Sequence, residues 1–214
     1  IMCGCQLWAQ GSLFSITINA GTNLSDMDVE RLSTDLKFGF RGNVTLEYNL
    51  PKSFFLQTGL AFSNKGAKIN DKNQSLSANG QTTITTHTKG KYNTNYLTLP
   101  LIGGYRLDVS DYIRMNLSLG PYFGYGIGGK TKYTAISEYS SGDTHSTTED
   151  INMKSFSDGL LRRFDMGLDG NVGIEYQKCL LNVGYEYGFI NQFKADNVSS
   201  YNMNFYVTLG YRIY

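Results

Sequence analysis

Proline and cysteine are both scarce in this chain, with three of each among 214 residues. Proline cannot donate a backbone hydrogen bond to a neighbouring strand, so its scarcity leaves room for many long strands. No apolar run approaches the roughly 18 residues that a transmembrane helix needs, which excludes such a helix. The 19 basic and 18 acidic residues give a net charge of +1, so no global electrostatic field points to nucleic acid as a partner.

The first ten residues differ from the rest of the chain because they are uncharged and fairly apolar, with the small Ala9 near their end. They resemble the tail of a secretory signal, which predicts a remnant over residues 1–9 and one domain over residues 10–214. An ordinary N-terminal extension, or a lipoprotein signal ending at Cys5, are the alternatives. Cleavage after Ala9 leaves Cys179 as the only cysteine, so we expect no disulfide framework.

One stretch, residues 35–48, alternates between apolar and polar side chains over fourteen residues without a slip. Its even positions run from Leu36 to Tyr48 and are apolar or glycine, whereas its odd positions are polar or glycine. Successive side chains of a strand point to opposite faces, so this pattern predicts a strand with one apolar face. A strand that crosses a bilayer needs about nine to eleven residues. The mean hydropathy of −0.29 is compatible with such strands, because only every second residue meets lipid.

The same alternation recurs along the chain and predicts eight strands. They cover residues 12–21, 35–48, 53–65, 96–107, 112–127, 163–176, 180–190 and 201–214. Short turns are expected at 49–52, 108–111 and 177–178. A polar loop is expected after the first strand and another over about 191–200, and the longest loops at 66–91 and 128–161, where no apolar period is found.

An even number of strands with short turns at one end and long loops at the other is how outer-membrane barrels are built. We therefore predict an all-β fold, an eight-stranded antiparallel up-and-down transmembrane β-barrel in a bacterial outer membrane, with both termini on the periplasmic side. A soluble lipocalin-like barrel also has eight strands, but its apolar faces point inward, and it needs neither such long strands nor such unequal ends.

Several segments also resemble a known family. Residues 96–101 (Tyr-Leu-Thr-Leu-Pro-Leu) and 103–107 (Gly-Gly-Tyr-Arg-Leu) are similar to the central strand of PorT-like outer-membrane β-barrels. Gly120-Pro121-Tyr122, 173–176 and 209–212 resemble the same family, over about residues 12–214. The resemblance implies the barrel class and little about the task, although the namesake of the family is associated with a protein-secretion system. The C-terminal strand of this chain resembles the family's assembly signal but departs from it, because Ile213, not an aromatic residue, stands two positions after Tyr211.

Catalytic and metal-binding motifs receive little support. Asp143-Thr144-His145-Ser146 places an acid, an imidazole and a hydroxyl close in sequence, but a working triad needs a geometry that adjacency does not supply. His145 with Asp143, Glu149 or Asp150 lacks a recognisable metal-ligand spacing. His87 lies in another polar loop. We therefore expect no enzyme activity, no cofactor and no metal.

Charged side chains alternate with the apolar ones, so they should face the barrel interior. Unpaired charges out of water are costly, which predicts an ion-pair and hydrogen-bond network. Its predicted members are Lys37, Arg41, Glu47, Arg106, Arg114, Arg163, Asp165, Asp169, Glu175, Glu186 and Arg212, with Lys65 and Asp35 beside them. The network could plug the lumen or line a selective channel, and the near balance of its charges favours a plug.

These observations predict a structural or binding role exerted through the long external loops. A narrow solute channel and an accessory component of a protein-secretion system are the alternatives. The expected partners are outer-membrane lipid, the outer-membrane assembly machinery and an extracellular ligand or a secretion-system component. We expect no nucleic acid and a monomeric protein.

Overall fold

The computed structural model describes residues 13–29, 34–76, 83–141, 143–156, 161–193 and 200–213. Nearly all of them lie in β-strands, with one short 3-10 turn, η1, at Pro51–Ser53. The strands are β1 (Phe14–Val29), β2 (Thr34–Asn49), β3 (Phe54–Lys65), β4 (Ala67–Leu76), β5 (Thr83–Asp108), β6 (Ile113–Ser141), β7 (Asp143–Lys154), β8 (Phe164–Tyr176), β9 (Cys179–Gly188) and β10 (Ser200–Arg212).

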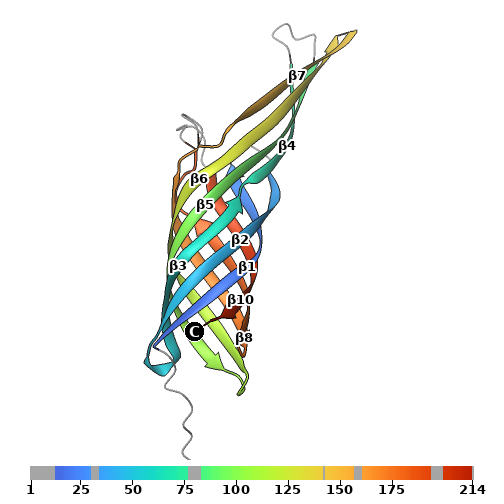
Figure 1. The fold of residues 1–214 in the computed structure, drawn as a ribbon. Helices are drawn as coiled ribbons and strands as arrows, with labels where there is room; N and C mark the ends of the chain where they lie inside the picture. Colours follow the sequence, from blue (N-terminus) through green and yellow to red (C-terminus); the bar gives the residue numbers. More distant parts are fainter. Residues whose placement is uncertain are drawn as a thin grey trace, which may run out of the picture.

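These ten segments occupy eight positions around a closed antiparallel barrel (Figure 1). β3 and β4 follow one another between β2 and β5, interrupted only at Gly66. β7 and β8 likewise follow one another along β6. The barrel closes where β1 pairs with β10, for example at Ile18 opposite Tyr211. The predicted fold class is therefore confirmed.

Three short turns lie at one end of the barrel, which we call the turn end. They connect β2 to β3 through η1, β5 to β6 through residues 109–112, and β8 to β9 through residues 177–178. The beginning of β1 and the end of β10 lie at this same end (Figure 1). The three predicted turns are confirmed. The two ends of the barrel domain lie on the same side of the barrel as these turns (Figure 1).

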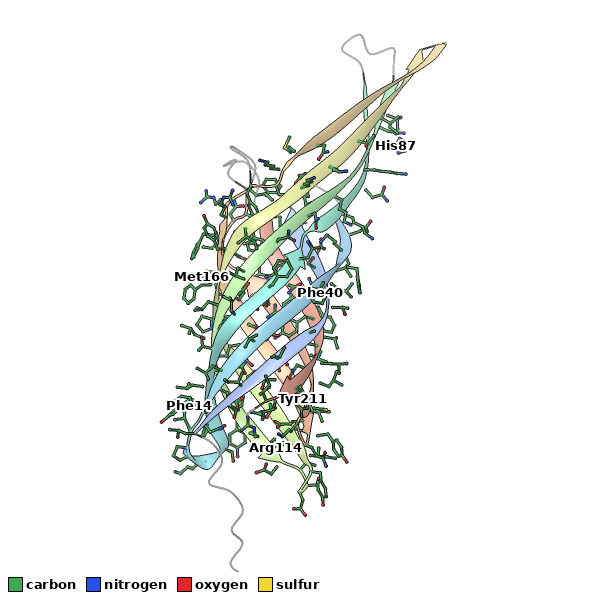
Figure 2. The ribbon with its side chains drawn as sticks, in the orientation of Figure 1. Phe14, Phe40, His87, Arg114, Met166 and Tyr211 are labelled. Atoms are coloured by element: carbon green, nitrogen blue, oxygen red, sulfur yellow. The ribbon has the colours of Figure 1, made fainter. Side chains whose placement is uncertain are left out.

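The outer wall of the barrel is apolar. Exposed Ile, Leu and Val side chains such as Val44, Leu117 and Leu209 cover its middle, and side chains radiate outward around it (Figure 2). Aromatic rings lie outward near the turn end, including Phe14, Phe54, Tyr112, Tyr176 and Tyr211. A second outward group lies toward the other end: Phe38, Phe40, Tyr125, Phe164 and Phe189. Two aromatic girdles around an apolar band are typical of membrane-spanning barrels.

Beyond the second girdle the barrel continues as a tilted sheet (Figure 1). Its strands are adjacent in the order β4, β5, β6 and β7, paired from Lys68 opposite Lys91 to Ser141 opposite Asp143. We call residues 70–76, 83–89, 134–141 and 143–150 the projecting sheet. The prediction of loops at 66–91 and 128–161 was therefore wrong for most of both stretches.

The first predicted loop was also placed too early, since β1 continues to Val29 and β2 starts at Thr34. In β1 the apolar period is broken because the outward Thr22 is polar, although Asn23 beside it is still buried in the barrel. The two long stretches have a different reason. An apolar period appears only where one face of a strand meets lipid, and a strand with water on both faces has none. Residues 83–88 (Thr-Ile-Thr-Thr-His-Thr) show a weaker signal, because they are rich in residues that favour strands.

Among the described residues, no helix is long and apolar enough to cross a membrane. The predicted signal remnant at 1–9 lies outside the described residues.

Candidate functional site in the barrel interior

The interior of the barrel is polar, the reverse of a soluble protein's core. Each strand that turns its apolar side chains outward turns its polar ones inward, and these are almost completely buried. They include Thr17, Asn19, Thr45, Ser63, Asn116, Asn202, Asn204 and Thr208. A charged group here finds its partners on strands across the lumen or, as Arg114 and Glu175 do, on the adjacent strand.

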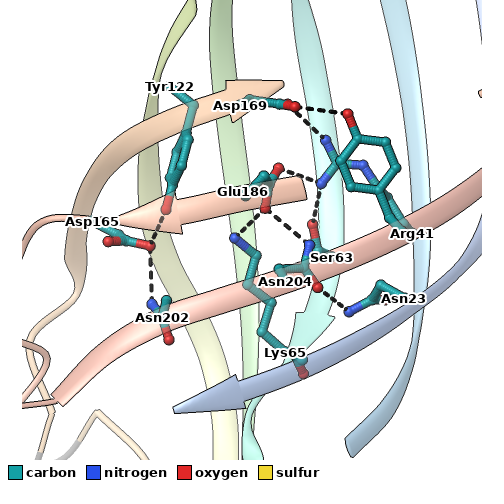
Figure 3. A network of polar contacts seen from close by, with 12 residues as sticks. Asn23, Arg41, Ser63, Lys65, Tyr122, Asp165, Asp169, Glu186, Asn202 and Asn204 are labelled. Atoms are coloured by element: carbon teal, nitrogen blue, oxygen red, sulfur yellow. Dashed lines mark hydrogen bonds and ion pairs between the residues drawn. The ribbon is translucent and has the colours of Figure 1, made fainter. Parts of the chain in front are cut away.

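Glu186 on β9 is the centre of one charge cluster (Figure 3). Its Oε1 lies 2.5 Å from Nη1 of Arg41 on β2, and its Oε2 lies 2.6 Å from Nζ of Lys65 on β3. Nδ2 of Asn204 also donates to Oε2 at 3.0 Å. A second carboxylate, Asp169 on β8, lies 3.6 Å from Nη2 of Arg41. All four charged side chains are at most 3% exposed, so we call them the waist cluster.

Tyrosine rings pack against both cations of the waist cluster. The guanidinium of Arg41 lies 4.1 Å from the ring centre of Tyr206, whose hydroxyl donates to Asp169 at 2.7 Å. Nζ of Lys65 lies 5.1 Å from the ring centre of Tyr122 and 5.6 Å from that of Tyr96. Cations over aromatic faces gain about 2 kcal/mol or more when desolvated. The rings therefore fill the lumen and hold its charges together.

Asp165 lies on β8, four residues before Asp169, and is fully buried. The structure gives it hydrogen bonds from neutral donors. The Tyr122 hydroxyl and Nε2 of Gln192 donate at 3.1 Å each, and Nδ2 of Asn202 donates at 2.9 Å. Gln192 is fixed in turn by the Tyr96 hydroxyl, which donates to its Oε1 at 2.8 Å. Polar side chains thus close the lumen above the waist cluster.

A second cluster lies toward the turn end, and we call it the basal cluster. Arg212 on β10 joins its two carboxylates, with Nη1 3.0 Å from Oε1 of Glu47 and Nη2 2.8 Å from Oε2 of Glu175. Arg106 also pairs with Glu47, and Arg114 pairs with Glu175 at 2.6 Å. The Arg114 side chain is 37% exposed, so this cluster reaches the end of the barrel.

Between the two clusters lies a polar cavity of about 50 Å³. Arg41 and Asp169 line it on one side and Glu47 on the other, with Thr17 and Asn43 in its wall. A cavity this size holds only a few water molecules.

The structure brings together nine of the predicted network residues: Arg41, Glu47, Arg106, Arg114, Asp169, Glu175, Glu186 and Arg212 in the two clusters, and Asp165 above them. Lys65 joins them as well. Lys37 is buried, but its Nζ donates to the backbone oxygen of Lys65 at 3.0 Å and to Asn64 at 2.5 Å rather than to a carboxylate.

Two predicted residues lie elsewhere. Arg163 is exposed just before β8 begins, where it donates to the Gly126 carbonyl at 2.8 Å and lies 5.3 Å from the Phe156 ring centre. Its prediction failed because the alternation was extended one residue before the start of β8. Asp35 is also exposed.

Sequence reasoning missed the neutral half of the network. Tyr122 and Tyr206 carry hydrogen bonds to Asp165 and Asp169, and Gln192 lies in the segment expected to be a loop. The signal that could have found Tyr122 is its position, since it alternates with outward Phe123 and Leu119.

The candidate catalytic and metal-binding residues 143–150 lie on β7, outside the barrel interior. The side chains of Asp143, His145, Glu149 and Asp150 lie outside the described part of the chain. His87 lies on the projecting sheet (Figure 2). Within the described residues, no group of three His, Cys, Asp or Glu side chains could hold a metal ion.

Comparison with known proteins gives one family match. A family model described as "Outer membrane protein beta-barrel domain" matches residues 8–194. A comparison with the curated proteins finds no match.

Three solved structures are among those similar to this chain. Ail, the attachment invasion locus protein of Yersinia pestis, has 15% identity and a TM-score of 0.42, with 94% of this chain and 100% of that chain covered. OprG from Pseudomonas aeruginosa has 14% identity and a TM-score of 0.46, with 94% and 96% covered. Neisserial surface protein A has 13% identity and a TM-score of 0.40, with 94% and 97% covered.

Proposed function

Because this chain belongs to the family of outer membrane protein β-barrel domains and resides in the bacterial outer membrane, we propose that it is a non-enzymatic binding protein with a sealed interior. The barrel anchors the chain in the bilayer, and the projecting sheet presents a binding surface outside the cell. The turn end then faces the periplasm, as short turns do in such barrels. The aromatic-rich β10 meets the assembly machinery during insertion, and the mature barrel is a monomer.

The observation that carries this proposal is the projecting sheet itself. Its four strands extend beyond the barrel, and its outer strands are β4 and β7. β4 pairs with β2 only over Ala67–Ile69, and among the described strands β7 pairs with β6 alone. A free strand edge displays a row of unpaired backbone donors and acceptors, which can accept a strand of another chain. Two such edges suit a partner that binds by strand addition.

The sealed interior is supported by the waist and basal clusters. Both span the lumen from strands that do not neighbour each other, for example β2 to β9 through Arg41 and Glu186. An eight-stranded barrel is just wide enough for side chains to fill it. The interior then serves as a stabilising plug, and the binding work falls to the outside.

The experiment removes the projecting sheet and leaves the barrel. Residues 70–89 and 134–150 are each replaced by an Asn-Gly turn, which joins Ile69 to Gly90 and Tyr133 to Ile151, both of them cross-strand pairs. Cross-linking on intact cells should join wild-type protein to its partner, and the trimmed protein should lose this product. Trimmed barrel that keeps its heat-dependent gel mobility controls for folding.

An unchanged cross-linked product from the trimmed protein would place the binding surface elsewhere and overturn the proposal. The second candidate is an accessory role in protein secretion, favoured by the PorT-like residues 96–101 and 103–107 on β5. In that case, deletion of the gene should block secretion of cargo proteins, and the trimmed protein should fail to restore it.

A further inference from the structure

A row of basic side chains runs along the outer wall from β4 to the start of β8, between the second aromatic girdle and the projecting sheet. We call this row the basic belt. It consists of Lys68 on β4, Lys91 on β5, Lys130 and Lys132 on β6, Lys154 on β7 and Arg163 before β8. All six side chains are exposed. They alternate with buried, inward neighbours such as Tyr92 and Thr131, so they share the outward face with the apolar band.

The strand register places the lysines of the basic belt directly opposite one another. Lys68 is paired with Lys91, Lys91 is paired with Lys132, and Lys130 is paired with Lys154. Side chains of directly opposed residues are about 5 Å apart at Cβ, and like charges in this arrangement repel. The one described acid in the row is Asp35, which is opposite Lys68 at its end. Such a row becomes favourable when anions lie between its cations.

The wall is also hollowed at the belt. β7 stops pairing with β6 at Lys130, and β8 begins to pair at Tyr125, which leaves a notch between them. A hollow of about 760 Å³ opens at this notch. Lys130, Lys154 and Arg163 line it, together with the amide side chains of Asn93 and Asn95. Its lining thus offers three cations and two further hydrogen-bonding groups to one ligand.

We propose that the basic belt binds the phosphate groups of outer-leaflet lipids, with one headgroup seated in the notch. Phosphates form strong charge-assisted hydrogen bonds with Lys and Arg. The choice of a lipid over a soluble anion comes from the neighbouring residues. Ile127 lines the same hollow and is exposed on the same face as Tyr125 of the aromatic girdle, so an anion bound here lies directly above the lipid tails. The outer leaflet is assigned from the orientation proposed above, whereas the binding itself is independent of it.

The test measures lipid binding to the whole purified protein in a non-ionic detergent. The probe is lipid A with two phosphates, followed by native mass spectrometry and by the thermal midpoint of unfolding. Wild type should bind it and gain thermal stability. The triple variant Lys91→Gln, Lys130→Gln and Lys132→Gln should bind on the order of a hundredfold more weakly, since each basic group near an anionic surface contributes a few-fold. Without lipid the triple variant should be at least as stable as wild type, because like-charge pairs are removed.

The matched control is Lys178→Gln, an exposed lysine at the turn end. This variant should bind lipid A as wild type does. Lipid A stripped of its phosphates should bind weakly to every variant, and inorganic phosphate alone should give no stabilisation at the same concentration. The proposal would be overturned if the triple variant bound lipid A as tightly as wild type does. It would also be overturned if wild type bound the stripped lipid as tightly as lipid A. Stabilisation by inorganic phosphate equal to that by lipid A would overturn the assignment to lipid.

Discussion

Glu186 is the carboxylate that pairs with both cations of the waist cluster. It is fully buried and is paired with both Arg41 and Lys65. Removing one partner of a buried ion pair leaves the other charge without compensation in a medium of low dielectric constant. The waist cluster is therefore sensitive to a change that alters charge without altering shape.

We expect Glu186→Gln to lower the free energy of unfolding by about 3–5 kcal/mol, because two buried cations lose their shared carboxylate. Equilibrium urea unfolding in lipid vesicles measures this change. Adding Lys65→Met should recover part of the loss. Arg114→Ala is the control, since Arg114 is partly exposed and Glu175 keeps Arg212, and it should cost about 1 kcal/mol or less. Wild-type stability of the Glu186→Gln protein would mean that the cluster contributes nothing.

The outward face offers a second test at single residues. Leu117 lies in the membrane part of β6 and is 62% exposed on the apolar wall. Leu117→Arg should cost about 2–4 kcal/mol, because it brings a charge into the hydrocarbon region. Tyr112→Arg, in the girdle at the turn end, should cost only about 0–1 kcal/mol. The same unfolding assay compares the two, and equal costs would contradict the position of the apolar band.

At the scale of elements, the break between β3 and β4 depends on one glycine. Gly66 has a φ of +140°, a conformation that side chains rarely adopt, and a Cβ there would overlap the backbone oxygen of Tyr92. Its backbone nitrogen donates to Oγ of Ser25 at 2.9 Å, and that hydroxyl donates back to the Gly66 oxygen at 3.0 Å. The junction thus shifts the strand from the barrel into the projecting sheet at a fixed point.

Gly66→Ala should therefore destabilise the barrel by roughly 1–3 kcal/mol or more, from backbone strain together with the overlap. The control is Gly103→Ala on β5, where an added Cβ meets no atom nearer than 4.0 Å. Gly103→Ala should be neutral or slightly stabilising. Thermal unfolding followed by loss of heat-dependent gel mobility compares the two variants. Equal midpoints would show that the strand break tolerates a side chain.

The membrane part of each element was predictable, and the projecting part was not. A strand with lipid on one face and the polar interior on the other must alternate apolar and polar side chains with a period of two. For this reason the predicted strands 35–48 and 112–127 match β2 and the first half of β6. Above the girdle both faces of β5 and β6 meet water, so the period disappears although the hydrogen-bonded ladder continues. Apolar alternation therefore reports where a strand meets lipid, and not where it ends.

The interior residues were predictable one by one, but their partners were not. The alternation places Arg41 and Glu186 on the inward face of separate strands. That they meet depends on barrel closure and on the offset between β2 and β9, which no local pattern contains. The neutral partners of Asp165 were missed for a related reason, because Tyr122 and Gln192 lack the charge by which interior residues were selected.

At the scale of the whole molecule, the two clusters determine whether anything can pass. The cavity between them is about 50 Å³, and an ion would have to cross the basal cluster to reach it and the waist cluster to leave it. An open pore would need a continuous water-filled path, and aqueous porins use about sixteen strands to form one. The two clusters hold five cations and four carboxylates, and buried Asp165 beside them adds a fifth carboxylate, so neither sign is in large excess to attract a passing ion.

We therefore expect wild-type protein to show little or no steady conductance in planar bilayers, because the waist cluster fills the lumen. The trimmed protein that lacks residues 70–89 and 134–150 should be equally silent, since those residues lie outside the barrel. A known aqueous porin in the same bilayers verifies that channels can be detected. Channels that open only after trimming would show that the projecting sheet closes the barrel. Reproducible open channels from wild type would contradict the sealed interior and favour the narrow solute channel.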